Sequence, residues 1–530
     1  MRPSFLPAAA FAAALAFGAA FPAVAATPPD VLVVAQSIDD AVSFDPAEGY
    51  ELTTIQTFNN VYQRLVQTDP AQNYKLVGAL ADSWEAAADG KSLTFKLKDG
   101  AKFASGNPVR PEDVVYSFVR ATKLNKTPFF ILQELGWTPD NVEGLVTKVD
   151  DTHVKVGWAA DIGANFALSI LSAPVASIVD QQVVAAHVTA DDFGNGWLKN
   201  NSAGSGQYSI QQYTAHDSLV LAANPTSPAG PPKLKTVILK NVADAAARRL
   251  LIEQGDADIA RDLGADQIAS LNGKPGIVVD ALDSAQQDYI ILNSANKDVA
   301  ALSNPAFWEA ARYLVDYNGI ANDLLKGQYA VHQSFLPVGF PGALTDNPFS
   351  FDPDKAKDIL SKAGLSNVTF TLTVSNQPPF TDIAQSLQAS FAKGGVTINI
   401  EPVVANDLYS KLRARTYQAA ALYWFPDYFD PNSNAGAFAL GRGDDGPHTV
   451  AWRAGWNIPE ISDQTHAAVV EQDPAKRAAL YATIQQEVEK SSPLIFILQA
   501  KDQVVLRDNV KNYVQGIDAD QVFFGQVEKQ

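Results

Sequence analysis

The sequence predicts an α/β protein, and its strongest signals lie in the C-terminal half. Apolar residues alternate with threonine over Val368–Val374, as in a strand with one buried face. A helical segment at about 381–393 follows and stops at Gly394-Gly395, and a second alternating strand covers Val396–Ile400. A strand, a helix and a strand in this order predict parallel strands joined by a right-handed crossover.

The same half contains a third strand and several helices with clear start signals. The run Gln418–Trp424 is nearly all apolar, which is typical of a strand covered on both faces. Three helices are expected to begin where an N-cap residue precedes proline, at Asn304-Pro305, Asp352-Pro353 and Asp473-Pro474. These elements predict a layered α/β domain.

The N-terminal half predicts a less regular α+β arrangement. Val31–Val34 indicates a short buried strand, and Leu93, Phe95 and Leu97 alternate after an Asp89-Gly90 turn, as in a hairpin. Further along the chain we expect a hairpin over 146–156, a strand at 237–239 and a helix beginning near Asp244.

The first 26 residues indicate a signal peptide. Arg2 precedes the uncharged apolar stretch Ala8–Phe21, and small residues follow up to Ala26. A membrane-spanning helix would need about 20 apolar residues, so an uncleaved anchor is disfavoured. We expect cleavage after Ala25 or Ala26 and a mature protein in the periplasm.

Composition excludes several classes of function. A chain of 530 residues allows about three domain-sized units. Its net charge of -18 argues against nucleic acid and anionic lipid surfaces as partners. The absence of cysteine excludes disulfides and thiolate metal sites, and the six histidines show no metal-binding spacing. We therefore expect no metal site and no cofactor.

The segment after the third predicted strand is the candidate ligand site. Four aromatic residues and two aspartates lie in Trp424–Pro431, and open α/β sheets bind ligands at strand carboxyl ends. Aromatic walls around one fixed charge suit an amphipathic cation such as a peptide amino terminus. Alternatively, the aromatic residues are core and Asp427 and Asp430 are turn residues.

Catalysis has little support in the sequence. No Ser–His–Asp order, metal cluster or cofactor loop stands out, so a secreted hydrolase is the least favoured hypothesis.

Six segments carry a resemblance to a known family and occur in the family's order. They are residues 43–69, 80–121, 204–208 (GSGQY), 251–260, 351–364 and 424–434 (WFPDYFDPNSN). The chain resembles the extracellular solute-binding protein family 5, the peptide- and nickel-binding components of ABC importers. The resemblance implies a monomer that delivers its ligand to an ABC permease in the inner membrane.

The resemblance also implies the domain organisation. The expected architecture is the two-lobed periplasmic binding protein fold (type II, cluster C) with an extra inserted subdomain. Lobe I would comprise 27–75, 205–290 and 502–530, the inserted subdomain 76–204, and lobe II 291–501. The chain crossings near 288–294 and 496–503 would form the hinge.

Site residues follow from the same resemblance. Asp427 would pair with the amino terminus of a peptide, and Trp424 and Phe425 would line the pocket. Val42 lies in a segment whose backbone pairs with the extended peptide in relatives. Phe129 falls at a pocket aromatic of relatives, although a core position explains it equally well.

Two further residues, Tyr428 and Trp452, are candidate ligand contacts only through their proximity to these motifs. The ligand itself stays open. Dipeptide binders of the family hold the ligand carboxylate with an arginine after the lobe II strand, and the matching stretch Ser375–Asp382 contains no arginine or lysine.

This departure argues against free dipeptides. Arg413 or Arg415 could serve longer peptides or could simply be solvated, and His332 or His448 could bind a nickel chelate. Opine-like compounds, oligosaccharides and metal chelates are therefore the alternatives to a peptide.

Overall fold

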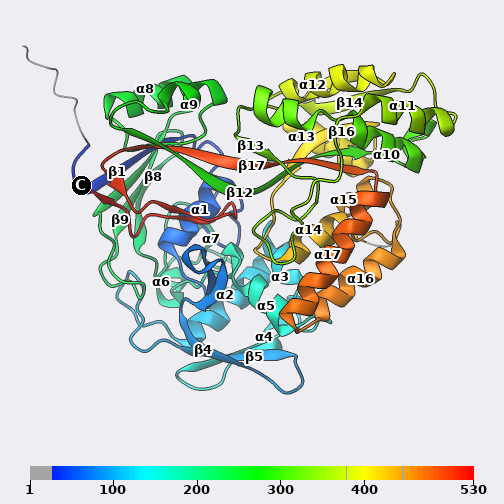
Figure 1. The fold of residues 1–530 in the computed structure, drawn as a ribbon. Helices are drawn as coiled ribbons and strands as arrows, with labels where there is room; N and C mark the ends of the chain where they lie inside the picture. Colours follow the sequence, from blue (N-terminus) through cyan, green and yellow to red (C-terminus); the bar gives the residue numbers. More distant parts are fainter. Residues whose placement is uncertain (1–26, 378, 445–446) are drawn as a thin grey trace, which may run out of the picture.

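The computed structural model describes residues 27–377, 379–444 and 447–530, and it confirms the predicted α/β class (Figure 1). The expected signal peptide, residues 1–26, lies outside the described residues. One mixed 11-stranded sheet runs through two lobes, and a four-stranded sheet lies at the bottom of Figure 1. Within the described ranges, no helix is both long enough and apolar enough to cross a bilayer.

The half of the large sheet called lobe I here is built around the buried strand β1 (Val31–Gln36). This strand pairs in parallel with β10 (Thr236–Asn241) and β11 (Ile259–Ala260). The sheet continues in antiparallel fashion through β9 (Ser218–Ala223) and β8 (Tyr208–Thr214). The helices of this lobe are α1 (Leu52–Val61), α8 (Ala245–Gln254) and α9 (Ala265–Leu271).

A subdomain carries the smaller sheet, and it confirms both predicted hairpins. The antiparallel order is β4 (Ala81–Ala86), β5 (Ser92–Leu97), β7 (His153–Gly157) and β6 (Val146–Lys148). Gly90 turns the first hairpin at φ 66, a conformation that favours glycine. The helices here are α2 (Pro111–Leu124), α3 (Phe129–Gln133), α4 (Val142–Leu145), α5 (Ala164–Leu171), α6 (Gln181–Ala185) and α7 (Asn195–Leu198).

The second half of the large sheet, lobe II, confirms the predicted β-α-β unit. Strands β14 (Thr369–Ser375) and β15 (Thr397–Val403) are parallel and are joined by α12 (Phe380–Lys393). The third predicted strand is β16 (Ala419–Trp424), parallel to β14. The other helices are α10 (Pro305–Leu314), α11 (Pro353–Lys362), α13 (Ala405–Ala414), α14 (Pro431–Phe438), α15 (Val450–Arg453), α16 (Pro459–Val470) and α17 (Pro474–Ser491).

The structure confirms the three predicted helix starts. Asn304, Asp352 and Asp473 cap α10, α11 and α17, because each side chain accepts a hydrogen bond from a backbone N–H of the first turn. In each case proline occupies the first helical position, where no N–H is needed.

Two long strands join the lobes. They are β12 (Ile277–Leu292) and β17 (Leu494–Arg507), which pair in antiparallel fashion and cross the molecule between the lobes (Figure 1). Their register shifts between Asp283 and Gln287, and again between Asp288 and Tyr289. The short strand β13 (Tyr329–Val331) also pairs with β17. The expected hinge therefore falls on a strand pair with an interrupted ladder.

The buried apolar residues form separate large clusters. One consists mainly of lobe II residues and also includes Ala285 and Ile517, a second occupies the subdomain, and a third fills lobe I. Tyr428 and Val469 of lobe II belong to the subdomain cluster, so these two parts share core contacts. The residue boundaries given above for lobe I, the inserted subdomain and lobe II stay a prediction.

A buried ion pair joins the N-terminal segment to the subdomain. Asp45 is 0% exposed, and both its oxygens accept hydrogen bonds from the guanidinium of Arg120 on α2. The amide of Asn195 adds a third bond at 2.6 Å. Removing one partner of such a pair leaves an uncompensated buried charge.

We expect Asp45→Asn to lower the free energy of unfolding by about 3–5 kcal/mol, because Arg120 loses its counter-charge. Urea denaturation followed by tryptophan fluorescence measures this loss. Asp358→Asn is the matched control, since Asp358 forms an exposed pair with Lys362 whose loss should cost less than about 1 kcal/mol. Equal stability of the two variants would contradict a structural role for Asp45.

Candidate functional site

The candidate site begins where β16 leaves the sheet. This strand lies between β14 and β12, so its carboxyl end opens near the crossing of the two lobes. The strand ends at Trp424, and beyond it the backbone N–H of Asp427 donates to the Ser433 hydroxyl at 2.6 Å. Asp430 caps α14, with its carboxylate accepting from the backbone N–H of Asn432 at 2.8 Å.

The two aspartates of this loop have different roles. Asp430 is 2% exposed and forms two bonds of 2.7 Å with the guanidinium of Arg477, so it is a structural residue. The turn-residue alternative is therefore right for Asp430. Asp427 is partly exposed, and among the described residues no ion pair is found at its carboxylate.

Asp427 accepts a hydrogen bond from a residue of the N-terminal segment, across the space between the two lobes. The Tyr50 hydroxyl, on the segment before α1, donates a hydrogen bond to the Asp427 carboxylate. Burial raises the pKa of Asp427 to about 6, against the lowering effect of this bond. Partial desolvation and then the charge of Asp427 raise the pKa of Glu134, which lines the same cavity. The charge of the Asp427 carboxylate is therefore compensated only weakly, although Arg442 and Arg453 also line this cavity.

A cavity of about 740 Å³ surrounds Asp427. Its walls come from the subdomain and from lobe II, and they combine aromatic and aliphatic side chains with polar groups. The apolar part includes Phe130, Ile162, Trp424, Tyr428, Leu440 and Val469. An enclosure of this composition is typical of small-molecule sites, in which apolar walls exclude water around a few fixed polar groups.

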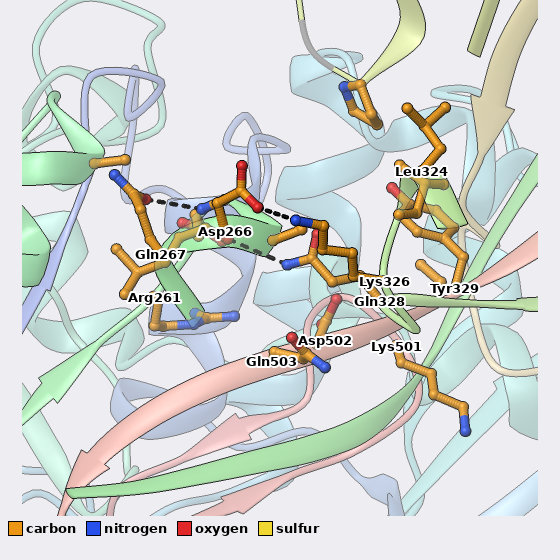
Figure 2. A pocket seen from close by; sticks show the side chains of 18 of the residues that line it. Arg261, Asp266, Gln267, Leu324, Lys326, Gln328, Tyr329, Lys501, Asp502 and Gln503 are labelled. Carbon is orange, nitrogen blue, oxygen red and sulfur yellow. Dashed lines mark hydrogen bonds and ion pairs between the residues drawn. The ribbon is translucent and has the colours of Figure 1, made fainter. Parts of the chain in front are cut away.

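Two further cavities are lined by other residues than the cavity around Asp427. The smaller, of about 410 Å³, lies between lobe I side chains and Phe380, Tyr423 and Phe425. The larger, of about 770 Å³, lies against β17 (Figure 2). They share Arg261, Asp262, Gln286, Tyr329, Pro379 and Asp502. Because these residues line both, the two cavities lie next to one another beside the crossing strands.

The predicted site residues are only partly brought together. Trp424, Asp427 and Tyr428 line the cavity around Asp427, and Phe425 lines the smaller of the two further cavities. Trp424 also donates its indole N–H to Asn434 at 3.2 Å, which fixes the ring. Tyr428 is 5% exposed and packs edge-on against Phe166, so it serves as both wall and core.

Three other predicted contacts lie elsewhere. Phe129 is 2% exposed in the subdomain core, whereas its neighbour Phe130 lines the cavity. Val42 is 65% exposed and is not among the residues lining the three cavities. Trp452 lines a separate pocket of about 160 Å³ and stacks on His448. A ligand role of these three residues stays a prediction.

The four residues considered for other ligands do not line the cavity around Asp427. His332 is buried, bonds the Leu336 carbonyl at 2.8 Å, and has its pKa lowered by desolvation. Arg415 pairs with Asp444 at 3.1 Å. Arg413 is exposed on α13, and His448 is exposed beside Trp452. None of the four lines the three cavities.

Two functional candidates had no signal of their own in the sequence. Tyr50 lies in segment 43–69 and Arg261 directly follows segment 251–260, but nothing in their spacing indicated a place in the cleft. Tyr50 lies 377 positions from Asp427, a contact that only the tertiary structure shows.

Comparison with known proteins gives consistent matches. Residues 75–446 match the model of the bacterial extracellular solute-binding proteins, family 5 Middle. The Probable D,D-dipeptide-binding periplasmic protein DdpA of Escherichia coli strain K12 is 30% identical over 516 residues, covering 96% of each chain. Di/tripeptide-binding protein 4 of Pseudomonas aeruginosa strain UCBPP-PA14 is 25% identical and covers 87% of this chain and 88% of its own.

Solved structures share the two-lobed fold. NikA from Brucella suis, in complex with Fe(III)-EDTA, has a TM-score of 0.81 at 18% identity and covers 94% of this chain and 100% of its own. DppA from Helicobacter pylori, in complex with the peptide STSA, has a TM-score of 0.77 at 21% identity, with coverages of 94% and 98%. At such identities the likeness shows the fold.

The raised pKa of Asp427 predicts a pH-dependent stability. The folded carboxyl titrates near 6 and an unfolded one near 3.9, so its ionisation above pH 6 lowers stability, by about 1–2 kcal/mol for a partly exposed group. We expect ligand-free Asp427→Asn to be more stable than the wild type at pH 7.5. The difference should fade as the pH falls through 6 towards 4, where both side chains are neutral.

Urea denaturation at pH 7.5, 6 and 4.5 measures this difference. The asparagine oxygen can still accept from Tyr50, so the comparison isolates the charge. A variant that is less stable at pH 7.5, or a difference independent of pH, would contradict an uncompensated carboxylate.

Proposed function

The chain belongs to the bacterial extracellular solute-binding proteins of family 5, and we propose that it captures a peptide between its lobes for an ABC permease of the inner membrane. The proposed location is the periplasm, which agrees with the signal-peptide pattern of residues 1–26 and with the periplasmic D,D-dipeptide-binding relative. In this role the protein binds its ligand unchanged and acts as a monomer.

The Asp427 carboxylate is the observation that carries the proposal. It lies on lobe II, bonds Tyr50 of lobe I, and faces a largely apolar cavity. A peptide ammonium placed there would compensate the charge and restore a low pKa, so ligand binding and ionisation of Asp427 would favour one another. A neutral ligand would gain nothing from this arrangement.

The hydrogen bond between Tyr50 and Asp427 also indicates how binding of a ligand would favour closure of the two lobes. Tyr50 and Asp427 lie on opposite sides of the cleft, and the ladder between β12 and β17 is interrupted close to it. An ammonium bound between the lobes would add contacts to both of them, and a ligand favours the conformation in which it makes more contacts. The interrupted ladder is the place where such a motion needs the fewest hydrogen bonds to break.

Other ligands of the family remain the second candidate. Solved relatives are recorded with agropinic acid and with Ni(L-His)2. The aromatic side chains Phe380, Tyr423 and Phe425 would also suit an opine-like compound, an oligosaccharide or a metal chelate. None of these ligands uses the charge of Asp427 as directly as a free amino terminus does.

We expect Asp427→Asn to weaken binding of a free peptide by about 2–5 kcal/mol, or about 30-fold to 5,000-fold in Kd, because a desolvated ammonium loses its partner. Calorimetric titration with a tripeptide and with its N-acetylated form measures the effect. The acetylated peptide should bind wild type weakly and should not discriminate between wild type and variant.

Asp354→Asn is the matched control, since Asp354 is an exposed residue of α11 paired with Lys357. It should bind the free peptide as the wild type does. Unchanged affinity of Asp427→Asn for the free peptide would rule out the proposed amino-terminal contact.

A further inference from the structure

Two neighbouring residues of the crossing strand β12 are fully buried although their side chains are polar. Gln287 is 0% exposed and Asp288 is 1% exposed. Neither the oxygen nor the nitrogen of the Gln287 side-chain amide has a hydrogen-bond partner among the described residues, and Oδ2 of Asp288 has none there either. Buried polar atoms without a protein partner raise the free energy of the conformation that buries them.

These two residues lie where the ladder between β12 and β17 is irregular. Its register shifts between Asp283 and Gln287 and again between Asp288 and Tyr289. On the other edge of β12, Asp288 lies opposite Tyr423 of β16. Gln287 and Asp288 are therefore at the point where β12 passes between the lobes, which is the expected hinge (Figure 1).

The Asp288 carboxyl has a single hydrogen-bond donor. Its Oδ1 accepts from the Gln286 side-chain amide at 2.8 Å, and the same amide nitrogen also donates to the Tyr329 hydroxyl at 3.3 Å. Burial raises the pKa of Asp288 to about 7, although the bond from Gln286 acts in the opposite direction. The geometry therefore favours the neutral acid over the carboxylate.

The groups packed around Asp288 do not supply a counter-charge. Tyr329 on β13 is a neutral phenol, because burial and then the charge of Asp288 raise its pKa. Tyr423 on β16 and its neighbour Tyr409 on α13 are also phenols, and Asp502 on β17 is a second acid that acts on Tyr329. In the described ranges, no lysine, arginine or histidine is found to act on Asp288.

We propose that Asp288 makes the hinge sensitive to pH: the neutral acid favours the packed crossing strands, and the carboxylate favours a conformation in which the lobes part and water reaches it. The inference goes beyond the proposed function, because it depends on no ligand. A solvated carboxyl has a pKa near 3.9, so the packed conformation binds this proton more tightly than a solvated one.

The direction of the effect follows from this difference. Above about pH 7, Asp288 is ionised in both conformations, and the packed one has the full cost of a buried charge. As the pH falls from about 7 towards about 4, only the packed conformation takes up the proton, so its share rises. The unpartnered amide of Gln287 disfavours the packed conformation at every pH and adds no pH dependence.

The distance between the lobes, followed by fluorescence energy transfer, tests the proposal. The chain contains no cysteine, so Leu250→Cys on α8 of lobe I and Val404→Cys beside α13 of lobe II provide the two dye sites, and both side chains are 51% exposed. All proteins carry Asp427→Asn, because that cleft acid also titrates near 6. We expect the ratio of short-distance to long-distance populations to rise by about 10-fold to 100-fold from pH 8 to pH 5.

Asp288→Asn keeps the shape of the side chain and an oxygen that accepts from Gln286, but it has no charge. It should show at pH 8 the ratio that its parent shows at pH 5, and this ratio should change by less than about 3-fold with pH. Glu489→Gln is the matched control. Glu489 is also buried and has its pKa raised to about 7 by desolvation, but it lies on α17 within lobe II, so its variant should keep the pH dependence of the parent.

Three results would overturn the proposal: a ratio that is the same at pH 8 and pH 5 in the parent, a pH dependence that survives in Asp288→Asn, or one that is lost equally in Glu489→Gln. The parent measurement needs no change at Asp288, so it is decisive even if Asp288→Asn does not fold. Asp288→Leu removes the same charge and should abolish the pH dependence as well.

Discussion

The antiparallel pairing of β12 with β17 is the constraint on which the rest of the structure depends. These strands carry the sheet from lobe II into lobe I, and they are the neighbours through which both halves join. On β12, Gln287 lies opposite Trp424 of β16 and opposite Gln499 of β17. Backbone pairing therefore places the end of β16 at the crossing of the lobes, and the Ser433 hydroxyl then holds the backbone of Asp427 just beyond it.

This placement gives the cleft its chemistry. The Asp427 carboxylate lies in a place where burial makes an unpaired charge costly. Asp45 and Asp430 avoid that cost by pairing with Arg120 and Arg477. In the proposed function, a cationic group of the ligand would relieve the cost borne by Asp427, and this relief would contribute to affinity.

Local patterns in the sequence predicted much of the fold. Features that depend on contacts between residues far apart in the chain could not be predicted from it. Alternation, caps and turn residues gave the β-α-β unit, both hairpins and the starts of α10, α11 and α17, because these depend on neighbours in the chain. The motif at Trp424–Pro431 indicated the candidate site but could not separate Asp427 from Asp430, since the difference lies in their contacts with Tyr50 and Arg477. Phe129 and Phe130 differ in the same way, because the packing of α3 decides which ring is buried.

A thermal-shift measurement of the mature protein with one ligand class at a time tests the central claim most directly. The classes are free tripeptides, oligosaccharides, opine-like compounds and nickel–histidine. A ligand at 100 times its Kd stabilises the folded state by about 2.7 kcal/mol. The account predicts a shift with free peptides and none with the other classes. A shift with another class and none with peptides would contradict capture through the Asp427 carboxylate.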